Sequence, residues 1–246
     1  MDNPERTSAL PRLQLLGVPP REVAGPGQMR CGQKPLVLLA RLLIEVRPVT
    51  REAMMAFLWP EVDEVRARGS LRQALHVIRE LAGPDCVAAD RQTLSMIRPP
   101  AADLHEFLSA VRNADWQRAA LAYGGPLLDG MTVKEASDAD MWLGLERRRL
   151  ARLFETAATT VLQARASAPS GDEYLVIARR FRDLSPGSAR SWRYLLEALE
   201  QKYELDALHL ERAALGARID TGQIDDPEAA LELLAGRTDG VKSSRP

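Results

Sequence analysis

The most regular spacing of apolar and polar residues lies between residues 47 and 81, where two helical patterns are separated by a short break at residues 59–61. Pro48 and Thr50 mark the start of the first helix, because a threonine hydroxyl there accepts a hydrogen bond from a free backbone N–H. Residues 87–97 follow as two short apolar runs around a polar turn, which predicts a hairpin. The order helix, turn, helix, hairpin is typical of a winged helix-turn-helix.

The second of these helices, expected over residues 65–82, has an apolar side and a basic side. At about 100° per residue, the apolar residues that fall on one side are Ala67, Leu71, Ala74, Leu75, Ile78 and Ala82. The other side holds Arg66, Arg68, Gly69, Arg72, Gln73, His76, Arg79 and Glu80. A helix buries its apolar stripe, so the basic side is expected to face outward.

Outward arginines beside a glutamine suit contact with duplex DNA. A guanidinium is a planar, permanent cation that matches guanine edges and phosphates, and the Gln73 amide matches adenine. The alternative is a solvated amphipathic helix with ordinary surface arginines, and the helix by itself does not decide between the two. The turn before it and the hairpin after it favour DNA binding.

Positions on the basic side are not equivalent. The central ones, which are the stronger candidates for groove contact, are Arg66, Arg72, Gln73 and His76. Arg68 and Arg79 lie at the edge of the apolar stripe, where their stems could equally cover leucines. Gly69 in mid-helix costs on the order of 1 kcal/mol relative to alanine. It either allows close backbone approach to a phosphate or is simply tolerated.

Two flanking segments add candidate phosphate contacts. The helix that Thr50 begins has free N–H groups that suit a phosphate, and Arg51 is placed to help. Residues 90–92 form the expected hairpin turn, or wing tip. Arg91 there is either a phosphate or minor-groove contact or an ordinary polar turn residue.

Several segments, taken together, resemble one known family. They are LQLLG at 13–17, KPLVLLARLL at 34–43, VTREAMMAFLWPEVDEVRARGSLRQALHVIREL at 49–81, DLHEF at 103–107, YGGPLLDG at 123–130 and WLGLERRRLARL at 142–153. Residues 13–97 resemble the winged-helix DNA-binding domain of the SARP-type bacterial transcriptional activators. Residues 101 to about 217 resemble their bacterial transcriptional activator domain, a helical module related to tetratricopeptide repeats.

The resemblance implies a function and shows two departures. It implies a tandem dimer bound to direct repeats upstream of promoters, with RNA polymerase holoenzyme recruited to the site. It also implies a small sheet ahead of the first helix. The family usually has asparagine where Gly69 stands. No ATPase or sensor domain follows the helical module, so a small, single-purpose version is expected.

The expected fold class is mainly α. A disordered stretch at residues 1–11 precedes a winged helix-turn-helix with small sheets at 12–98. After the consecutive prolines Pro99 and Pro100, which favour an extended linker, an all-α tetratricopeptide-like domain spans 101–219. Residues 220–246 are expected to form a loose tail, although 226–235 have the composition of a short helix.

Within these domains the sequence predicts further elements. Short strands are expected at residues 13–16 and near Val23 and Met29, followed by a helix at 34–46. Later helices are expected at 103–113, 116–123, 138–167, 173–184, 189–201 and 206–217. Trp142 and Trp192 are interpreted as core residues rather than binding anchors. Residues 146–152, ERRRLAR, are interpreted as a solvated helix face, with a second nucleic-acid patch as the alternative.

Composition adds a modest charge asymmetry. Residues 1–98 contain 14 basic and 11 acidic residues, whereas residues 99–246 contain 19 and 23. A mildly basic first part suits a DNA-binding module joined to a protein-contacting one. The two cysteines, Cys31 and Cys86, form no CxxC pair. With no signal peptide and no apolar run of membrane-spanning length, a reduced, cytoplasmic protein is expected.

Signals for catalysis or cofactors are weak. His76, His105 and His209 have no metal-ligand spacing, and no phosphate-binding, nucleophile-elbow or zinc-protease motif occurs. We therefore expect no enzyme, no cofactor and no metal site. The sequence favours a sequence-specific DNA-binding transcription regulator, and the resemblance implies an activator that forms a homodimer on DNA. The alternative is a helical-repeat protein–protein adaptor whose winged helix does not bind DNA specifically.

Overall fold

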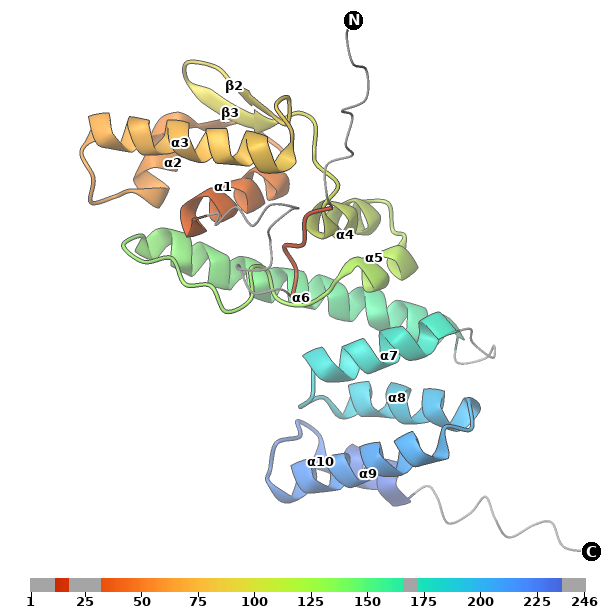
Figure 1. The fold of residues 1–246 in the computed structure, drawn as a ribbon. Helices are drawn as coiled ribbons and strands as arrows, with labels where there is room; N and C mark the ends of the chain where they lie inside the picture. Colours follow the sequence, from red (N-terminus) through yellow and green to blue (C-terminus); the bar gives the residue numbers. More distant parts are fainter. Residues whose placement is uncertain (1–11, 18–31, 166–171, 236–246) are drawn as a thin grey trace, which may run out of the picture. The chain divides into compact units, whose positions relative to one another are not determined.

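The computed structural model describes residues 12–17, 32–165 and 172–235. The expected disorder at 1–11, the strands near Val23 and Met29, Cys31 and the last eleven residues lie outside these ranges. The chain packs as two compact units, residues 1–154 and 155–246. The predicted domain borders near residues 98–101 and 219 stay a prediction. The expected fold class is confirmed at the level of a mainly helical chain with a small antiparallel sheet (Figure 1).

The first unit begins with three helices, α1 (Gln33–Ile44), α2 (Arg51–Leu58) and α3 (Glu64–Ala82). These match the predicted helices to within two residues at each end. Leu36 and Leu39 on α1 are fully buried, as the sequence spacing predicted. Helix α1 packs against α2 and α3, so the core of this part forms between the three helices.

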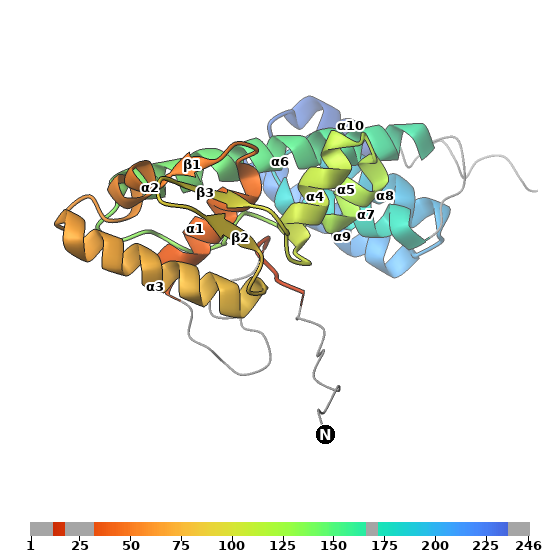
Figure 2. The same cartoon turned by 90° about the horizontal axis from the view of Figure 1, so that it is seen from above.

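A three-stranded antiparallel sheet closes this core, in the order β1, β3, β2 (Figure 2). Strands β2 (Val87–Ala89) and β3 (Thr93–Met96) form the predicted hairpin, with Val87 opposite Met96. Strand β1 (Val49–Thr50) pairs with β3 directly before α2. Two residues are too few for a detectable alternating pattern, so the sequence did not predict β1.

The expected sheet ahead of the first helix is wrong for the residues that the structure describes. Leu13 forms an isolated bridge to Ala102, and Leu16 forms one to Leu127. The segment forms no strand of a sheet there because the Asp103 carboxylate binds its backbone. This carboxylate accepts hydrogen bonds from the N–H groups of Leu15 (2.8 Å) and Leu16 (3.1 Å). The segment therefore packs on residues that come much later in the chain.

Helices α4 (Asp103–Arg112), α5 (Trp116–Ala122) and α6 (Ser137–Arg165) follow. Helices α4 and α5 form a tight pair, as predicted. Their core is aromatic, since Tyr123 stacks on Phe154 at 4.8 Å between ring centroids and lies 5.1 Å from Phe107. Burial raises the pKa of Tyr123 to about 12.

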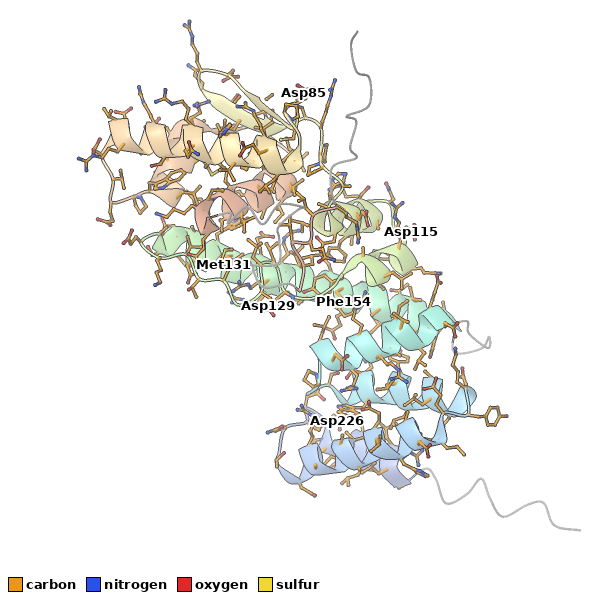
Figure 3. The ribbon with its side chains drawn as sticks, in the orientation of Figure 1. Asp85, Asp115, Asp129, Met131, Phe154 and Asp226 are labelled. Carbon is orange, nitrogen blue, oxygen red and sulfur yellow. The ribbon has the colours of Figure 1, made fainter. Side chains whose placement is uncertain are left out.

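One arginine of the 146–152 segment is not part of a solvated face. The guanidinium of Arg147 donates to the backbone carbonyl oxygens of Leu127 (2.8 Å), Leu128 (2.5 Å) and Met131 (2.9 Å). Figure 3 shows Met131 and Asp129 on the loop beside α6. Leu128 has a positive φ of 45°, so Arg147 holds a loop that the backbone alone would not favour. The expectation of a wholly solvated face is corrected here.

The second unit contains α7 (Asp172–Leu184), α8 (Ala189–Gln201), α9 (Leu205–Asp220) and α10 (Pro227–Ala235). Helix α10 packs on α8 and α9, so the expected loose tail is wrong for residues 227–235 and the alternative of a short helix holds. Trp192 is buried and donates to the carbonyl oxygen of Pro186 at 2.9 Å, as expected of a core residue. None of the helices in the described ranges is long and apolar enough to cross a membrane.

Candidate nucleic-acid interface

Helix α3 has the two sides that the sequence predicted. All six residues of the predicted apolar stripe are buried. The helix begins at an acidic cap, because Asp63 accepts a hydrogen bond from the backbone N–H of Arg66 at 3.0 Å. The sequence reasoning missed this cap, although an aspartate before a helical run is a recognised signal for it. Because the apolar stripe is buried, the basic side of α3 faces away from the core.

The start of α2 is fixed as expected. The Thr50 hydroxyl oxygen accepts a hydrogen bond from the backbone N–H of Ala53 at 3.1 Å. The predicted cap is thus confirmed, and the Thr50 hydroxyl oxygen is used to hold the start of the helix. Thr50 also belongs to β1, so the same residue ends a strand and begins a helix.

Arg51 joins the start of α2 to the β2–β3 turn. Its backbone N–H donates to the carbonyl oxygen of Gln92 at 2.8 Å. Its guanidinium Nη1 donates to the carbonyl oxygen of Asp90 at 3.1 Å. The side chain that the sequence assigned to a phosphate therefore also holds the hairpin turn in place.

The turn has its own acidic anchor in Asp90. One carboxylate oxygen accepts from the backbone N–H groups of Gln92 (2.7 Å) and Thr93 (2.5 Å), and the other accepts from the Thr93 hydroxyl (2.8 Å). The N–H donors of Thr93 and Gln92 hold the pKa of Asp90 below its ordinary value. The turn therefore has a defined shape that presents Arg91 outward.

These elements surround an open groove of about 1140 Å³, which we call the α2–α3 groove. Its lining residues are Thr50, Arg51, Glu52, Met55, Glu64, Arg68, Arg72, Ala89, Asp90, Arg91, Gln92 and Thr93. The β2–β3 turn with its flanking strand residues forms one wall, and the first half of α3 forms the other. Five of the nine predicted site residues are thus brought together by three separate elements.

The arginines in this groove differ in their partners. Arg68 Nη2 lies 2.5 Å from Glu64 Oε1, so this arginine is held inside the groove by an exposed ion pair. Arg72 and Arg91 form no salt bridge with any residue in the described ranges. An unpaired guanidinium is free to bind a phosphate or a base edge without first losing a partner.

The remaining predicted residues lie outside the groove. Arg66 forms an ion pair with Asp63 at 3.3 Å, and His76 Nε2 lies 3.3 Å from a carboxylate oxygen of Glu80. Both are exposed, as is Gln73. Arg79 is half-buried and donates to the carbonyl oxygen of Val87 at 3.4 Å, so it links α3 to β2. Arg79 therefore has a structural partner and lies outside the groove, whereas Arg68 lines it. The DNA contact predicted for each stays a prediction.

A second, smaller groove lies in the second unit. It has a volume of about 460 Å³, and its lining residues are Glu155, Ser188, Ala189, Arg190, Arg193, Asp225, Asp226, Ala229, Glu232 and Leu233. Two of its carboxylates are helix caps, because Asp225 accepts from the N–H of Ala189 (2.9 Å) and Asp226 from that of Ala229 (3.0 Å). Figure 3 shows Asp226 in this region. This groove is lined by side chains of both charges.

Metal binding has no support in the described ranges, where no group of three or more histidine, cysteine or acidic side chains is arranged to hold an ion. Cys86 is buried, and burial raises the pKa of its thiol.

Neither a protein-family model nor a curated protein matches this sequence. Among solved structures, it is similar to one described as Mycobacterium tuberculosis EmbR in complex with low affinity phosphopeptide, with 19% sequence identity and a TM-score of 0.48. The similarity covers 91% of this chain and 64% of that chain, so this chain spans less than two thirds of the EmbR length. A similarity this weak assigns neither a family nor a function to this chain, and the resemblance to SARP-type activators stays a prediction.

Proposed function

We propose that the protein is a sequence-specific DNA-binding transcription regulator of the winged-helix type. The observation that carries this proposal is the α2–α3 groove, where arginines from a helix start, an outward helix face and a hairpin turn meet. Cationic groups on three elements around one groove suit a duplex, in which phosphates flank the groove that holds the bases.

In this proposal α3 enters the major groove, and the flanking elements bind the backbone. Arg72 is placed to contact a base edge, and Arg68 a phosphate once it leaves Glu64. Arg91 at the hairpin turn binds a flanking phosphate. The start of α2 lies beside it, although its Arg51 and Ala53 N–H groups already donate to the Gln92 carbonyl oxygen and the Thr50 hydroxyl. The proposal assigns no catalytic role, cofactor or metal to the chain.

The regulatory part of the proposal comes from the resemblance to SARP-type activators. It includes a homodimer on direct repeats, contact with RNA polymerase holoenzyme and activation of transcription. The similar EmbR structure is a complex with a phosphopeptide, and we carry no such partner over to this chain.

A protein–protein adaptor is the second candidate function. It is favoured by the groove between α8 and α10, which is open and lined by side chains of both charges that could pair with complementary charges on a partner. In an adaptor the arginines of α3 would be ordinary surface cations.

Selection of bound duplexes from a random DNA pool separates the two. We expect the parent to enrich a repeated motif, and Arg72→Ala to weaken binding to it by about tenfold, in line with the cost of losing one base contact. Arg118→Ala, at an exposed position on α5, is the matched control and should bind like the parent. If the parent enriches no motif at moderate salt, the DNA-binding proposal fails and the adaptor is favoured.

A further inference from the structure

Helix α3 carries one ridge beside its groove-lining side, and the two share Arg72. Val65, Gly69, Arg72 and His76 are spaced by four, three and four residues, so they lie one above the other on the outward face. At about 1.5 Å per residue the ridge is roughly 16 Å long. That length corresponds to about five base-pair steps.

Neither the backbone conformation nor the packing around position 69 requires a glycine. It lies in mid-helix, its φ is not in the left-handed region, and a Cβ added there would meet no atom within 4 Å. Alanine would stabilise the helix at such a position. A glycine that neither the backbone nor the packing requires leaves room for a partner outside the chain to approach the helix backbone closely.

Val65 is the second unexplained feature of the ridge. It is 79% exposed, in the first turn of a helix whose other large apolar side chains are buried or half-buried. Its neighbours Glu64 and Arg66 form their ion pairs to the two sides of the ridge. The Val65 methyl groups therefore stand free between two charged pairs.

We propose that this ridge is the base-reading edge of α3, that Val65 contacts the C5-methyl group of a thymine, and that Gly69 is where the helix backbone approaches the base edges most closely. The thymine methyl is the apolar group that the major groove offers, and small apolar side chains recognise it. This inference rests on the proposed function and names specificity residues within it. Arg68, turned toward Glu64 and the groove, is left for the phosphates.

The first arm of the test uses the duplex selected by the parent protein. Each thymine in it is replaced in turn by deoxyuridine, which removes only the C5-methyl group. We expect one replacement to weaken the parent by about fivefold, the effect of one lost base contact. Val65→Ser should bind the two duplexes equally at that position. Val176→Ser, at an exposed helical valine on α7, is the matched control and should keep the parent's preference.

The second arm compares stability with binding. Gly69→Ala should raise or leave unchanged the denaturation midpoint, while it weakens specific binding by about tenfold, because a methyl group now lies where the DNA approaches. Gly144→Ala on α6, where an added Cβ meets only the Arg148 Nη1 atom at 3.8 Å, is the matched control and should bind as the parent does.

The outcomes separate this inference from the proposed function. One outcome would overturn the inference while the parent still selects a motif. In it, Gly69→Ala binds that motif as tightly as the parent, and Val65→Ser loses as much affinity as the parent when deoxyuridine replaces thymine. The ridge would then not contact the bases. In that case the regulator proposal stands. If the parent selects no motif, both fail together.

Discussion

The guanidinium of Arg51 donates a hydrogen bond to the backbone carbonyl oxygen of Asp90, at 3.1 Å between Nη1 and O. The two residues are 39 positions apart, at the start of a helix and at a hairpin turn. Together with the backbone bond from Arg51 to Gln92 (2.8 Å), this contact sets where the turn and Arg91 stand relative to α2.

We expect Arg51→Ala to loosen the turn and weaken specific DNA binding. One side-chain hydrogen bond to the backbone is worth about 1 kcal/mol, and the backbone bond to Gln92 remains. Amide exchange at Gln92 and Thr93 should accelerate. Arg51→Lys keeps the charge but not the planar donor pair. If the lysine variant restores both the exchange rates and the binding, Arg51 acts through its charge alone and the positioning role is wrong.

Acid should release the turn through Asp90. The folded-state pKa of Asp90 is below its ordinary value of 3.8 because backbone N–H groups stabilise the carboxylate. Its contribution to the turn is therefore complete above that value and is lost as pH falls below it, through the lowered folded-state value. The amide shift of Thr93, followed by NMR, should titrate with a midpoint below 3.8. Asp90→Asn should remove this transition, and a midpoint at or above the ordinary value would contradict the geometry.

Removing a negative charge from the α2–α3 groove should strengthen non-specific DNA binding. Glu64→Gln frees Arg68 from its ion pair and makes the net charge beside the phosphates more positive. The slope of log affinity against log salt should steepen by about one. Glu61→Gln, at an exposed residue before α3, changes the net charge equally and serves as the control. Equal effects of the two variants would mean that net charge, not the groove, is responsible.

Arg147→Ala should destabilise the first unit. Three carbonyl oxygens lose a charged donor, and bonds to charged groups contribute about 1.5–3 kcal/mol each before relaxation and water replace them. We expect a net loss of about 2–3 kcal/mol in urea denaturation. Arg147→Lys should recover only part of it. Arg148→Ala, a change of the same type at an exposed position of α6, should lose less than about 1 kcal/mol.

Alkaline unfolding should involve Tyr123. Burial raises its pKa from 10.0 to about 12, so the folded state holds the phenolic proton longer than the unfolded chain. The stability this represents is complete below pH 10 and is lost as pH rises toward 12. Tyr123→Phe should move the alkaline unfolding midpoint upward, measured by circular dichroism. Tyr203→Phe, at a residue that is 84% exposed, should leave it unchanged.

Local features of this chain were predictable from local signals. The Thr50 cap, both sides of α3 and the β2–β3 hairpin follow from the spacing of apolar residues and from the hydrogen-bonding groups of residues close in sequence. Such interactions span a few residues, so a short stretch of sequence contains all their determinants. The same holds for α4, α5, α8 and most of the later helices.

Which arginines share a groove was not predictable in this way. A helical wheel placed Arg72 and Arg66 together near the centre of the basic side. Only Arg72 of the two lines the groove, because the β2–β3 turn lies across the groove from one flank of α3. The position of the hairpin decides which flank this is, and the helical periodicity of α3 contains no information about a hairpin that lies further along the chain. Arg68, at the edge of the wheel, faces the groove for the same reason.

The sequence by itself determined most of the helices, the β2–β3 hairpin, the amphipathic α3 and the basic character of its outward side. Only the tertiary structure decided that residues 13–16 bind near Asp103, that Arg147 holds a distant loop and that Arg51 joins α2 to the hairpin. The physical reason is the distance along the sequence over which each interaction acts. Periodicity and caps record what neighbouring residues do to one another, whereas a buried carboxylate or guanidinium takes whichever backbone groups the folded chain brings to it.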